Sequence, residues 1–492
     1  MQDWLAMRAS ASPEKIAIIE HLSATETNEI SYKHLNWRVD DMCRRMLNAG
    51  IERGQHVGMV MMNSTLAIVP FFAAMRLGVV FVPINARLTI DEMDFQLRQA
   101  DCDWLLPYAL TDTLAGLRDK GHRLANIEQK PKKKISIPER EIDLNAPFFI
   151  VHTSGTSGKP KGATLTYGNV FYSAMASAYR IGHLPDDKWL CVLPLYHVGG
   201  LSIFIRALLY GITVDLRQSF DVQAINHALT HDGVMLVSLV PTMLFRLLRE
   251  REGDWHPALR LVLLGGSAAT PELMQRCLEE NIPVATTYGL TEASSQVATT
   301  LPGDAARKPG TVGKPLSFTQ VKIVDEAGNP QGQGEYGEIL VKGLSVMQGY
   351  YNNPDATAKA IQDGWLQTGD IGYLDEDGDL WLVQRRSDLI VSGGENVYPA
   401  EVEGVLRQHP AIAEVAVVGI DDPEWGQRVA AAIVLETGAT LSQNEVESYS
   451  REHLAGYKIP RIVCFVDSLP LTGSGKVQRT AVRELFSEGN VD

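Results

Sequence analysis

The segment from residue 152 to 162 reads His-Thr-Ser-Gly-Thr-Ser-Gly-Lys-Pro-Lys-Gly and carries the groups that a polyphosphate site needs. Its glycines let the backbone turn N–H groups toward phosphate oxygens. Its hydroxyls, glycines and ammonium groups belong to Thr153, Ser154, Gly155, Thr156, Ser157, Gly158, Lys159, Lys161 and Gly162. The alternative is an ordinary polar turn, but the length and both lysines argue against it. The segment therefore predicts a nucleotide site.

This phosphate loop does not follow the Walker pattern, which needs a glycine five residues before the Gly-Lys pair and Ser or Thr after the lysine. Thr153 and Pro160 occupy those two positions. A proline there would disturb the helix that begins at a Walker lysine. The sequence therefore disfavours a P-loop NTPase.

Further motifs follow the phosphate loop in a fixed order. They are Thr287-Tyr288-Gly289-Leu290-Thr291-Glu292, Thr368-Gly369-Asp370, Arg385 followed by Ser392-Gly393-Gly394-Glu395-Asn396, and Gly473-Ser474-Gly475-Lys476. With these motifs the chain resembles the adenylate-forming superfamily of acyl-CoA synthetases, nonribosomal adenylation domains and luciferases. The resemblance extends over nearly the whole chain, from the Pro13 to Ile18 region to Lys476.

The resemblance implies a two-step reaction with ATP, Mg²⁺ and coenzyme A. A carboxylate is first joined to AMP, with release of pyrophosphate, and a thiol then attacks the mixed anhydride. Glu292 is expected to bind Mg²⁺, a hard cation that prefers oxygen ligands. The remaining expected nucleotide contacts are Gly265, Gly266, Ser267 and Tyr288 at the adenine, Gly289 beside it, Thr291 at the α-phosphate, and Asp370 with Arg385 at the ribose. Lys476 is expected to bridge the carboxylate and the α-phosphate as the catalytic cation.

The resemblance also implies a moving C-terminal lid. Its expected hinge is Arg385-Arg386-Ser387-Asp388, where Ser387 stands in place of the Asp or Lys of many relatives. Rotation would bring Gly393 and Gly394 to the side from which the thiol of coenzyme A enters. An ordinary β-turn is the alternative for this glycine pair.

The acyl pocket is expected near the stretch Leu193-Pro194-Leu195-Tyr196-His197-Val198-Gly199-Gly200-Leu201-Ser202. This stretch and residues 265–271 resemble those of the o-succinylbenzoate–CoA ligase family of the menaquinone and phylloquinone pathways. His197 is expected at the pocket mouth as a catalytic and substrate-binding residue, with Gly199 and Gly200 leaving room for a flat ring. The candidates to bind a remote carboxylate, which is costly to bury unpaired, are Ser202, Arg206, Thr287, Ser294, Ser295 and Gln296. A core role for His197 and a packing or ion-pair role for Arg206 stay open.

Composition agrees with a large enzyme of several domains. The chain has 492 residues, of which 45% are hydrophobic and 21% charged, and no apolar stretch reaches the roughly 18 residues of a membrane span. The net charge of -14 argues against a nucleic-acid partner. The five cysteines show no metal-binding spacing, and no secretory signal is visible at the N-terminus. These features predict a cytoplasmic protein that acts on a small carboxylic acid, ATP and coenzyme A, with a homo-oligomer left open.

Short apolar strands alternate with helix-length segments in the first part of the chain, which is typical of parallel sheets. These strands are expected at 16–19, 56–62, 79–82, 104–107, 148–151, 188–193, 234–240 and 260–264. Gly-punctuated strands at 320–324, 337–342 and 378–383 indicate a small β subdomain. The predicted fold is thus α/β, with an N-terminal domain of two α/β subdomains and a β subdomain at 1–385 and a mobile α+β lid at 386–492.

The sequence favours an ATP-dependent CoA ligase for o-succinylbenzoate. A ligase for another aryl or medium-chain acid is the first alternative, since only the acyl pocket separates the two. A carrier-loading domain and a non-catalytic nucleotide sensor are further alternatives. No carrier is evident after Lys476, and a sensor would have little need of Glu292 and Lys476.

Overall fold

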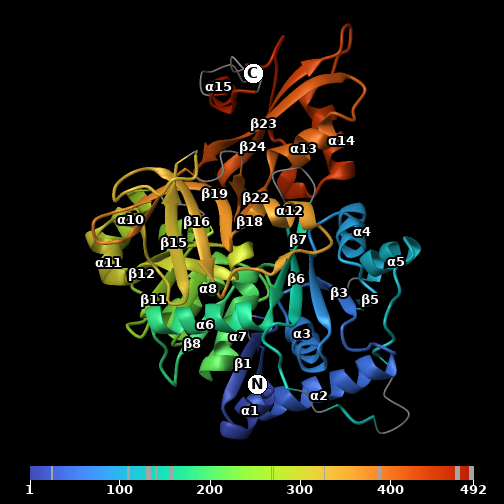
Figure 1. Ribbon diagram of the computed structural model, residues 1–492, viewed down its shortest axis with the longest axis vertical. Coiled ribbons are helices and arrows are strands. Elements are labelled where there is room, and N and C mark those ends of the chain that lie inside the picture. Colours follow the sequence, from blue (N-terminus) through green and yellow to red (C-terminus); the bar gives the residue numbers. More distant parts are fainter. Residues whose placement is uncertain are drawn as a thin grey trace. The chain divides into compact units, whose positions relative to one another are not determined.

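The computed structural model describes residues 1–23, 26–107, 111–128, 135–138, 141–154, 160–266, 269, 271–325, 327–384, 389–470 and 477–486 (Figure 1). The chain divides into two compact units. The first unit comprises Met1–Ala86, Asp94–His152 and Gly162–Gln384, and the second comprises Arg87–Met93, Thr153–Lys161 and Arg385–Asp492.

A six-stranded sheet has the strand order β17-β7-β6-β4-β3-β5 among the described residues. Its strands are β3 (His56–Met61), β4 (Val80–Asn85), β5 (Trp104–Leu106), β6 (Pro147–Ser154), β7 (Pro160–Thr166) and β17 (Gly349–Tyr350). β3 pairs in parallel with both β4 and β5, and β4 with β6, so their carboxyl ends meet at one edge. Ligands bind at such an edge in α/β proteins, and β6 leads there directly into the phosphate loop.

A second, fourteen-stranded sheet runs in the order β15-β16-β19-β20-β14-β13-β12-β11-β10-β8-β9-β1-β2 within the described part of the chain, with β18 paired to β19. Its first half comprises β1 (Ile16–His21), β2 (Thr27–Ser31), β8 (Lys188–Cys191), β9 (Thr213–Leu216), β10 (Leu236–Leu239), β11 (Leu261–Leu264) and β12 (Val284–Leu290). Its second half comprises β13 (Ser295–Thr299), β14 (Thr311–Pro315), β15 (Thr319–Val324), β16 (Gly337–Gly343), β18 (Ile361–Gln362), β19 (Trp365–Leu374) and β20 (Leu380–Gln384). Strands β8 to β12 are parallel. Strands β13 to β16 and β18 to β20 form the antiparallel β subdomain, gold and orange in Figure 1.

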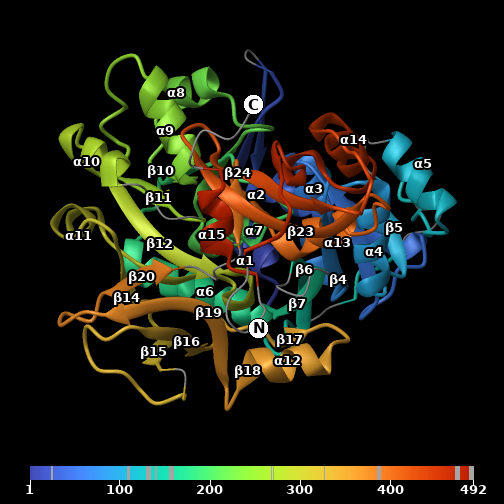
Figure 2. The ribbon, with the colours of Figure 1, turned by 90° about the horizontal axis from the view of Figure 1, so that it is seen from above.

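Helices cover these sheets in the first unit. They are α1 (Trp4–Ala11), α2 (Tyr32–Asn48), α3 (Thr65–Leu77), α5 (Thr111–Asp119), α6 (Tyr167–Ile181), α7 (Val198–Tyr210), α8 (Val222–His231), α9 (Pro241–Glu250), α10 (Pro271–Glu279), η1 (Thr291–Ala293), α11 (Pro302–Arg307) and α12 (Pro354–Ala360), while α4 (Ile90–Gln99) begins in the second unit. The main core lies around α3, α6 and α7, and α7 is almost wholly buried. A second core lies where α8, α9 and α10 gather beside β10 and β11 (Figure 2).

The second unit contains a five-stranded sheet in the order β22-β21-β24-β23, with β25 paired to β24 among the described residues. Its elements are β21 (Ile390–Ser392), β22 (Glu395–Val397), α13 (Pro399–Leu406), β23 (Ile412–Asp422), β24 (Gly426–Leu435), α14 (Gln443–His453), η2 (Gly456–Lys458), β25 (Ile462–Phe465) and α15 (Arg479–Glu484). Ser442 and Glu445 form a capping box that begins α14. Cores on both faces of the sheet make this unit α+β, as the sequence predicts.

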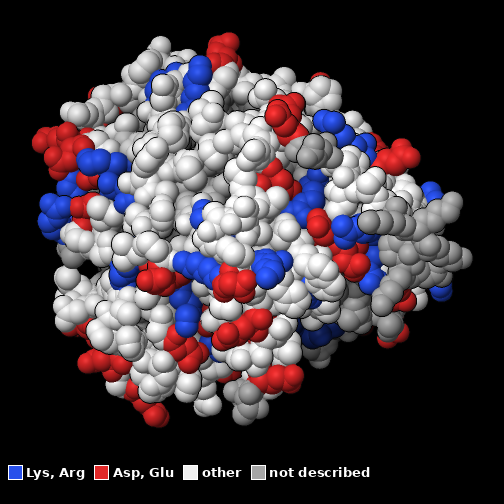
Figure 3. All heavy atoms as spheres, turned by 90° about the horizontal axis from the view of Figure 1, so that it is seen from below, with Lys and Arg blue, Asp and Glu red and all other residues white. Residues whose placement is uncertain are grey.

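The charged side chains on the surface and the hydropathy of the helices bear on possible partners. On the face drawn in Figure 3, acidic and basic side chains are interspersed rather than gathered by sign. Within the described residues, no helix has the length and apolar character that a membrane crossing requires.

Candidate active site

The phosphate loop begins where β6 ends. The side chain of Thr153 donates a hydrogen bond to the backbone oxygen of Lys161 (3.4 Å), which joins the two ends of the loop. A Cβ atom on Gly162 would lie 2.6 Å from Ile150 Cγ2, so glycine is needed for β7 to pack there. Ser154 is placed by its backbone at the end of β6. The predicted contacts Gly155, Thr156, Ser157, Gly158 and Lys159 lie outside the described residues.

The adenine and ribose candidates meet at the carboxyl end of β12. Tyr288 is buried, and its hydroxyl donates to Asp370 Oδ2 at 2.6 Å. The backbone N–H of Asp370 donates to the hydroxyl of Thr368, which donates in turn to the backbone oxygen of Ile339. Two motifs far apart in the sequence therefore share one hydrogen-bond chain, which orients the Asp370 carboxylate. Stacking of adenine on Tyr288 stays a prediction.

The glycines around Tyr288 are explained by close backbone contacts. A Cβ atom on Gly289 would lie 1.7 Å from the backbone oxygen of Ser295, and one on Gly265 would lie 2.7 Å from Thr287 Cγ2. Gly266 has a φ of +88°, which glycine adopts readily. Gly265 thus lets the end of β11 approach β12, and Gly289 lets β12 approach β13. Ser267 lies outside the described residues.

Glu292 lies in η1, directly after β12, and is 5% exposed. The hydroxyl of Tyr350 donates to its Oε1 at 2.7 Å, and its backbone oxygen accepts from the N–H of Met347 at 2.8 Å. No described side chain donates to its second carboxylate oxygen, Oε2. Mg²⁺ prefers hard oxygen ligands, and the Oε2 atom of this nearly buried carboxylate could serve as one. Thr291 is half-buried one residue earlier on the same turn.

The chain after Glu292 is strained. Ser294 and Ser295 have φ values of +55° and +97°, which cost non-glycine residues about 1–3 kcal/mol each. Side-chain and backbone bonds hold Ser294, since its hydroxyl donates to the Ser345 oxygen and its own oxygen accepts from Ser173. Strain of this kind is concentrated at functional sites.

Two of the predicted acid-binding residues, Thr287 and Gln296, form a hydrogen bond with one another. Gln296 Nε2 donates to the hydroxyls of Thr287 (3.3 Å) and Thr299 (3.0 Å), and Thr287 also bonds to the backbone oxygen of Ala298. The Oε1 atom of Gln296 is buried without a hydrogen-bond partner. Thr287 and Gln296 therefore stiffen the β12–β13 hairpin, and a direct contact of theirs with the acid stays a prediction.

A small pocket lies in the first unit. Helical spacing explains its walls, because residues three and four positions apart share one helix face. Its lining residues are Val198, Ser202, Ile205 and Arg206 from α7, Val170, Ser173 and Ala174 from α6, Phe149 from β6 and Ser294 after η1. Three predicted acid-binding residues, Ser202, Arg206 and Ser294, are thus brought together around one mostly apolar space.

Arg206 is a buried cation with no counter-charge among the residues that the structure describes. It is 2% exposed, Nη2 lies 3.4 Å from the Ser295 hydroxyl, and Nε has no hydrogen-bond partner. The guanidinium carbon lies 5.8 Å from the ring centre of Trp189. Among the described residues no carboxylate pairs with it, and burial lowers the pKa of Arg206. An anion entering the pocket would relieve this cost of desolvation.

His197 lies at the N-cap of α7, one residue before the pocket-lining Val198. Its side chain does not cap the helix, and its ring lies 4.7 Å from that of Tyr196. A Cβ atom on Gly200 would lie 2.3 Å from the backbone oxygen of Pro194, so close packing of the loop explains this glycine. The substrate contacts of His197 and Gly200 stay predictions.

In the second unit, Gly393 and Gly394 form the two-residue turn between β21 and β22, with φ values of +59° and +84°. A pair of positive φ angles is typical of a type I′ hairpin. The β-turn alternative is therefore present, which leaves the predicted thiol-side role untested. Arg385 and Lys476 lie outside the described residues.

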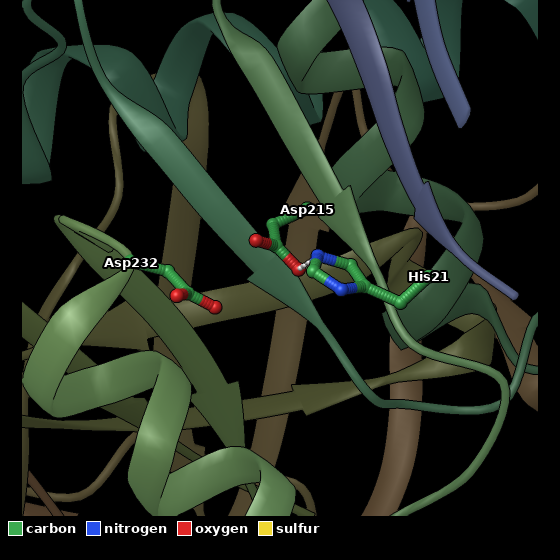
Figure 4. A group of neighbouring side chains, drawn as sticks. All are labelled: His21, Asp215 and Asp232. Atoms are coloured by element: carbon green, nitrogen blue, oxygen red, sulfur yellow. Dashed lines mark ion pairs between the residues drawn. The ribbon is translucent and has the colours of Figure 1, made fainter. Parts of the chain in front are cut away.

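Two acidic clusters that resemble metal sites already hold a cation from the protein. His21, Asp215 and Asp232 converge in Figure 4, where His21 Nε2 lies 3.3 Å from Asp215 Oδ1. Arg217 pairs with Asp215 and with Asp232, each at 2.7 Å. Likewise, Lys308 Nζ is surrounded by the carboxylates of Asp375, Asp377 and Asp379. Both clusters are structural ion-pair networks.

The sequence did not single out Tyr350, Ser173 or Trp189. Tyr350 follows a glycine in the run Gly349-Tyr350-Tyr351, but no pattern shows that its hydroxyl contacts Glu292, which is distant in the sequence. Ser173 and Trp189 fall in apolar stretches and look like core residues. Their roles follow from contacts between remote segments, which one sequence cannot reveal.

With this geometry in place, comparisons with known proteins identify the class. The model of the AMP-binding enzyme family matches residues 5–351, and that of the AMP-binding enzyme C-terminal domain matches residues 401–476. The chain belongs to the AMP-binding enzyme family. The predicted superfamily and the predicted α/β fold class are therefore confirmed.

Within this family, the chain is similar over its full length to ligases that have been named individually. A 2-succinylbenzoate–CoA ligase of Bacillus cereus is 41% identical, with 99% of both chains covered. The o-succinylbenzoate CoA synthetase of Bacillus subtilis, as a double mutant with a product analogue, is 36% identical with a TM-score of 0.92 and 98% of both chains covered. The same protein has been solved with the acyl-adenylate intermediate, at a TM-score of 0.75 with 98% of both chains covered, and with ATP and magnesium, at 0.75 with 98% of this chain and 99% of that one covered.

Proposed function

We propose that this chain is an ATP-dependent ligase that converts 2-succinylbenzoate (o-succinylbenzoate) and coenzyme A into 2-succinylbenzoyl-CoA, with release of AMP and pyrophosphate. Its family membership and full-length relatives of that name support the proposal. The observation that carries the choice of acid is the pocket lined by Arg206. A dicarboxylate brings a second anion into the enzyme, and no carboxylate in the described part of the chain pairs with this buried guanidinium.

The nucleotide half of the site would be formed by the phosphate loop and the β12 hairpin. Thr153 to Lys161 would bind the phosphates through backbone N–H groups, hydroxyls and lysines. Asp370, oriented by Tyr288, would accept hydrogen bonds from the ribose hydroxyls, with Arg385 nearby. Gly265, Gly266, Ser267 and Gly289 would line the adenine, and Thr291 would contact the α-phosphate. Lys476 would neutralise charge at the reacting carboxylate and α-phosphate.

Glu292 fits a magnesium ligand because it is nearly buried, is held by Tyr350 through one oxygen and keeps Oε2 for a cation. Bound Mg²⁺ would neutralise phosphate charge as pyrophosphate leaves. Glu292 itself would fix the position of the nucleotide phosphates relative to β12.

The acyl half would be formed by α6, α7 and the turn after η1. Arg206 would pair with the succinyl carboxylate, while Ser202 and Ser294 would donate or accept hydrogen bonds at the pocket wall. Phe149, Val170 and Ala174 would contact the aromatic ring. His197 would lie at the entrance.

The proposal also covers the C-terminal lid and the cell compartment of the enzyme. The domain boundary would fall near residue 385, and the C-terminal domain at 386–492 would rotate between the two steps, with Gly393 and Gly394 on the thiol side. The protein would act in the cytoplasm, in keeping with its five free cysteines, on small molecules rather than nucleic acid. A homo-oligomer is left open by the sequence.

The decisive experiment measures AMP release that depends on ATP and coenzyme A with 2-succinylbenzoate, benzoate, 4-coumarate and octanoate, with each thioester identified by mass. We expect strong preference for 2-succinylbenzoate. Preference for a monocarboxylate would keep the ligase mechanism and reject the assigned acid, whereas no AMP with any acid would favour a sensor. Lys476→Ala should abolish adenylation yet spare thioester formation from preformed acyl-adenylate, and loss of both steps would contradict its role.

A further inference from the structure

Tyr350 connects two parts of the first unit that the reaction must keep in register. Its hydroxyl donates to Glu292 Oε1 at 2.7 Å, and both side chains are at least nine-tenths buried. Its backbone belongs to β17, which pairs antiparallel with β7, with Tyr350 opposite Ala163. One residue therefore joins the acidic turn to β7, the strand that follows the phosphate loop in the sequence.

The surrounding segment is held on both sides. The N–H of Met347 donates to the backbone oxygen of Glu292, while the N–H groups of Gln348 and Tyr351 donate to the oxygens of Thr164 and Gly162 at 3.0 and 2.8 Å. Residues 347–351 therefore form a short bridge, called here the 347–351 bridge, between η1 and β7. Such a bridge transmits the position of one element to the other.

The far end of the bridge is fixed by α12. The N–H of Tyr350 donates to the hydroxyl of Thr357 at 2.9 Å. A Cβ atom on Gly349, whose φ is +150°, would lie 2.7 Å from Thr357 Cγ2. The glycine thus lets Thr357 approach and hold the Tyr350 backbone, so little freedom is left for the hydroxyl to move away from Glu292.

We propose that Tyr350 is a positioning residue for magnesium: it holds Oε1 of Glu292 through its hydroxyl and presents Oε2 to the metal in a fixed register with the Gly162–Thr164 part of β7. The inference rests on the proposed role of Glu292. Hydrogen-bond partners of metal ligands orient them, and removing such a partner typically weakens metal affinity by about 10- to 100-fold. Tyr350 would act through Glu292.

The test compares Tyr350→Phe with Tyr351→Phe, a matched control in the same bridge. Tyr351 donates its hydroxyl to Asp101 at 3.2 Å, away from Glu292. Mn²⁺ binding would be measured by electron paramagnetic resonance in the presence of a non-hydrolysable ATP analogue. We expect Tyr350→Phe to weaken Mn²⁺ binding by about 10- to 100-fold and Tyr351→Phe to leave it unchanged. Binding of the analogue in EDTA should change by less than about twofold in both variants.

Kinetics supply a second readout. For pyrophosphate release, Tyr350→Phe should raise the Mg²⁺ concentration for half-maximal rate by the same factor, with kcat at saturating Mg²⁺ nearly restored. A general loss of structure would instead lower kcat and weaken metal-free nucleotide binding, and either result would overturn the inference. Unaltered Mn²⁺ affinity in Tyr350→Phe would overturn it as well.

Glu292→Gln separates this inference from the proposed function. If Glu292→Gln binds Mn²⁺ like the unaltered enzyme, the assignment of Glu292 fails and the inference fails with it. If Glu292→Gln weakens Mn²⁺ binding and Tyr350→Phe does not, only the role of Tyr350 is wrong. In the double variant, Tyr350→Phe should add no further loss, because the hydroxyl acts through the carboxylate.

Discussion

Two buried arginines of the first unit have opposite surroundings. Arg76 bonds to Asp3 at 2.8 Å and to Asp40 at 2.6 Å, and also to Asn36. Burial alone would lower the pKa of Arg76, but the hydrogen bonds and charges of these aspartates raise it. Arg206 has no such carboxylate among the described residues, and burial lowers its pKa. An arginine with a structural role, such as Arg76, is paired with carboxylates of the protein. An arginine that lines a pocket and has no such partner, such as Arg206, is suited to bind the anion of a ligand.

The largest effect is expected when Arg206 is replaced. Arg206→Met should lower kcat/KM for 2-succinylbenzoate by about 10²- to 10³-fold, since losing one partner of a buried charge pair costs about 2–5 kcal/mol. The value for benzoate should change little, because benzoate has no second carboxylate. Steady-state kinetics with both acids measure the difference.

A matched variant checks the geometry of this interaction. Arg206→Lys keeps the charge but loses the planar fork that binds a carboxylate through two hydrogen bonds, so its loss should be intermediate. If Arg206→Met lowers kcat/KM equally for both acids, Arg206 only supports packing. Its role would then be structural, like that of Arg76.

Stability should change in the opposite sense to activity. Arg76→Met should lower the free energy of unfolding by about 3 kcal/mol, because Asp3 and Asp40 would be left partly buried without a cation. Arg206→Met should leave this free energy unchanged or raise it, since it removes an uncompensated buried charge. Urea unfolding without substrates measures both values. A large loss of stability in Arg206→Met would show that the structure depends on this arginine too.

The contrast between these arginines also shows what the sequence can reveal. The phosphate loop and most strands were predictable from local composition and periodicity, whereas the Tyr288 and Asp370 motifs were predicted from the resemblance to a known family. Arg206 was predictable only as one of several candidates, because its lack of a counter-charge depends on where every aspartate and glutamate folds. The bonds from Tyr288 to Asp370 and from Tyr350 to Glu292 join segments far apart in the chain. No period or spacing encodes such contacts.

His152 offers a smaller and pH-dependent case of a half-buried base with no counter-charge among the described residues. Its Nε2 bonds to Gln99 Oε1 at 2.9 Å, its Nδ1 is buried without a partner, and burial lowers the pKa of His152 to about 3. Between about pH 6.5 and 3, the unfolded chain therefore binds a proton that the native state does not. Stability should fall as the pH falls through this range, by up to about 1.4 kcal/mol per pH unit from this group.

The variant His152→Gln removes this titration while keeping a neutral donor toward Gln99. Its free energy of unfolding should depend less steeply on pH than that of the unaltered protein between pH 6.5 and 5, in matched urea titrations. Parallel curves for the two proteins would mean that His152 is protonated as easily in the native state as in the unfolded chain.

The smallest effect is expected at Lys308, which is the exposed counterpart of Arg76. Its amine donates to Asp377, to Asp379 at 2.9 Å and to Asp375 at 3.0 Å, and these hydrogen bonds raise the pKa of Lys308. Water and salt screen this cluster, so Lys308→Met should lower the melting temperature by less than Arg76→Met does. The decrease should largely vanish at about 0.5 M salt, where the screening length is only a few ångströms. If the decrease in melting temperature persists at high salt, Lys308 stabilises its turn through hydrogen-bond geometry rather than through charge. An ion pair at the surface would then contribute to stability as the buried pairs of Arg76 do.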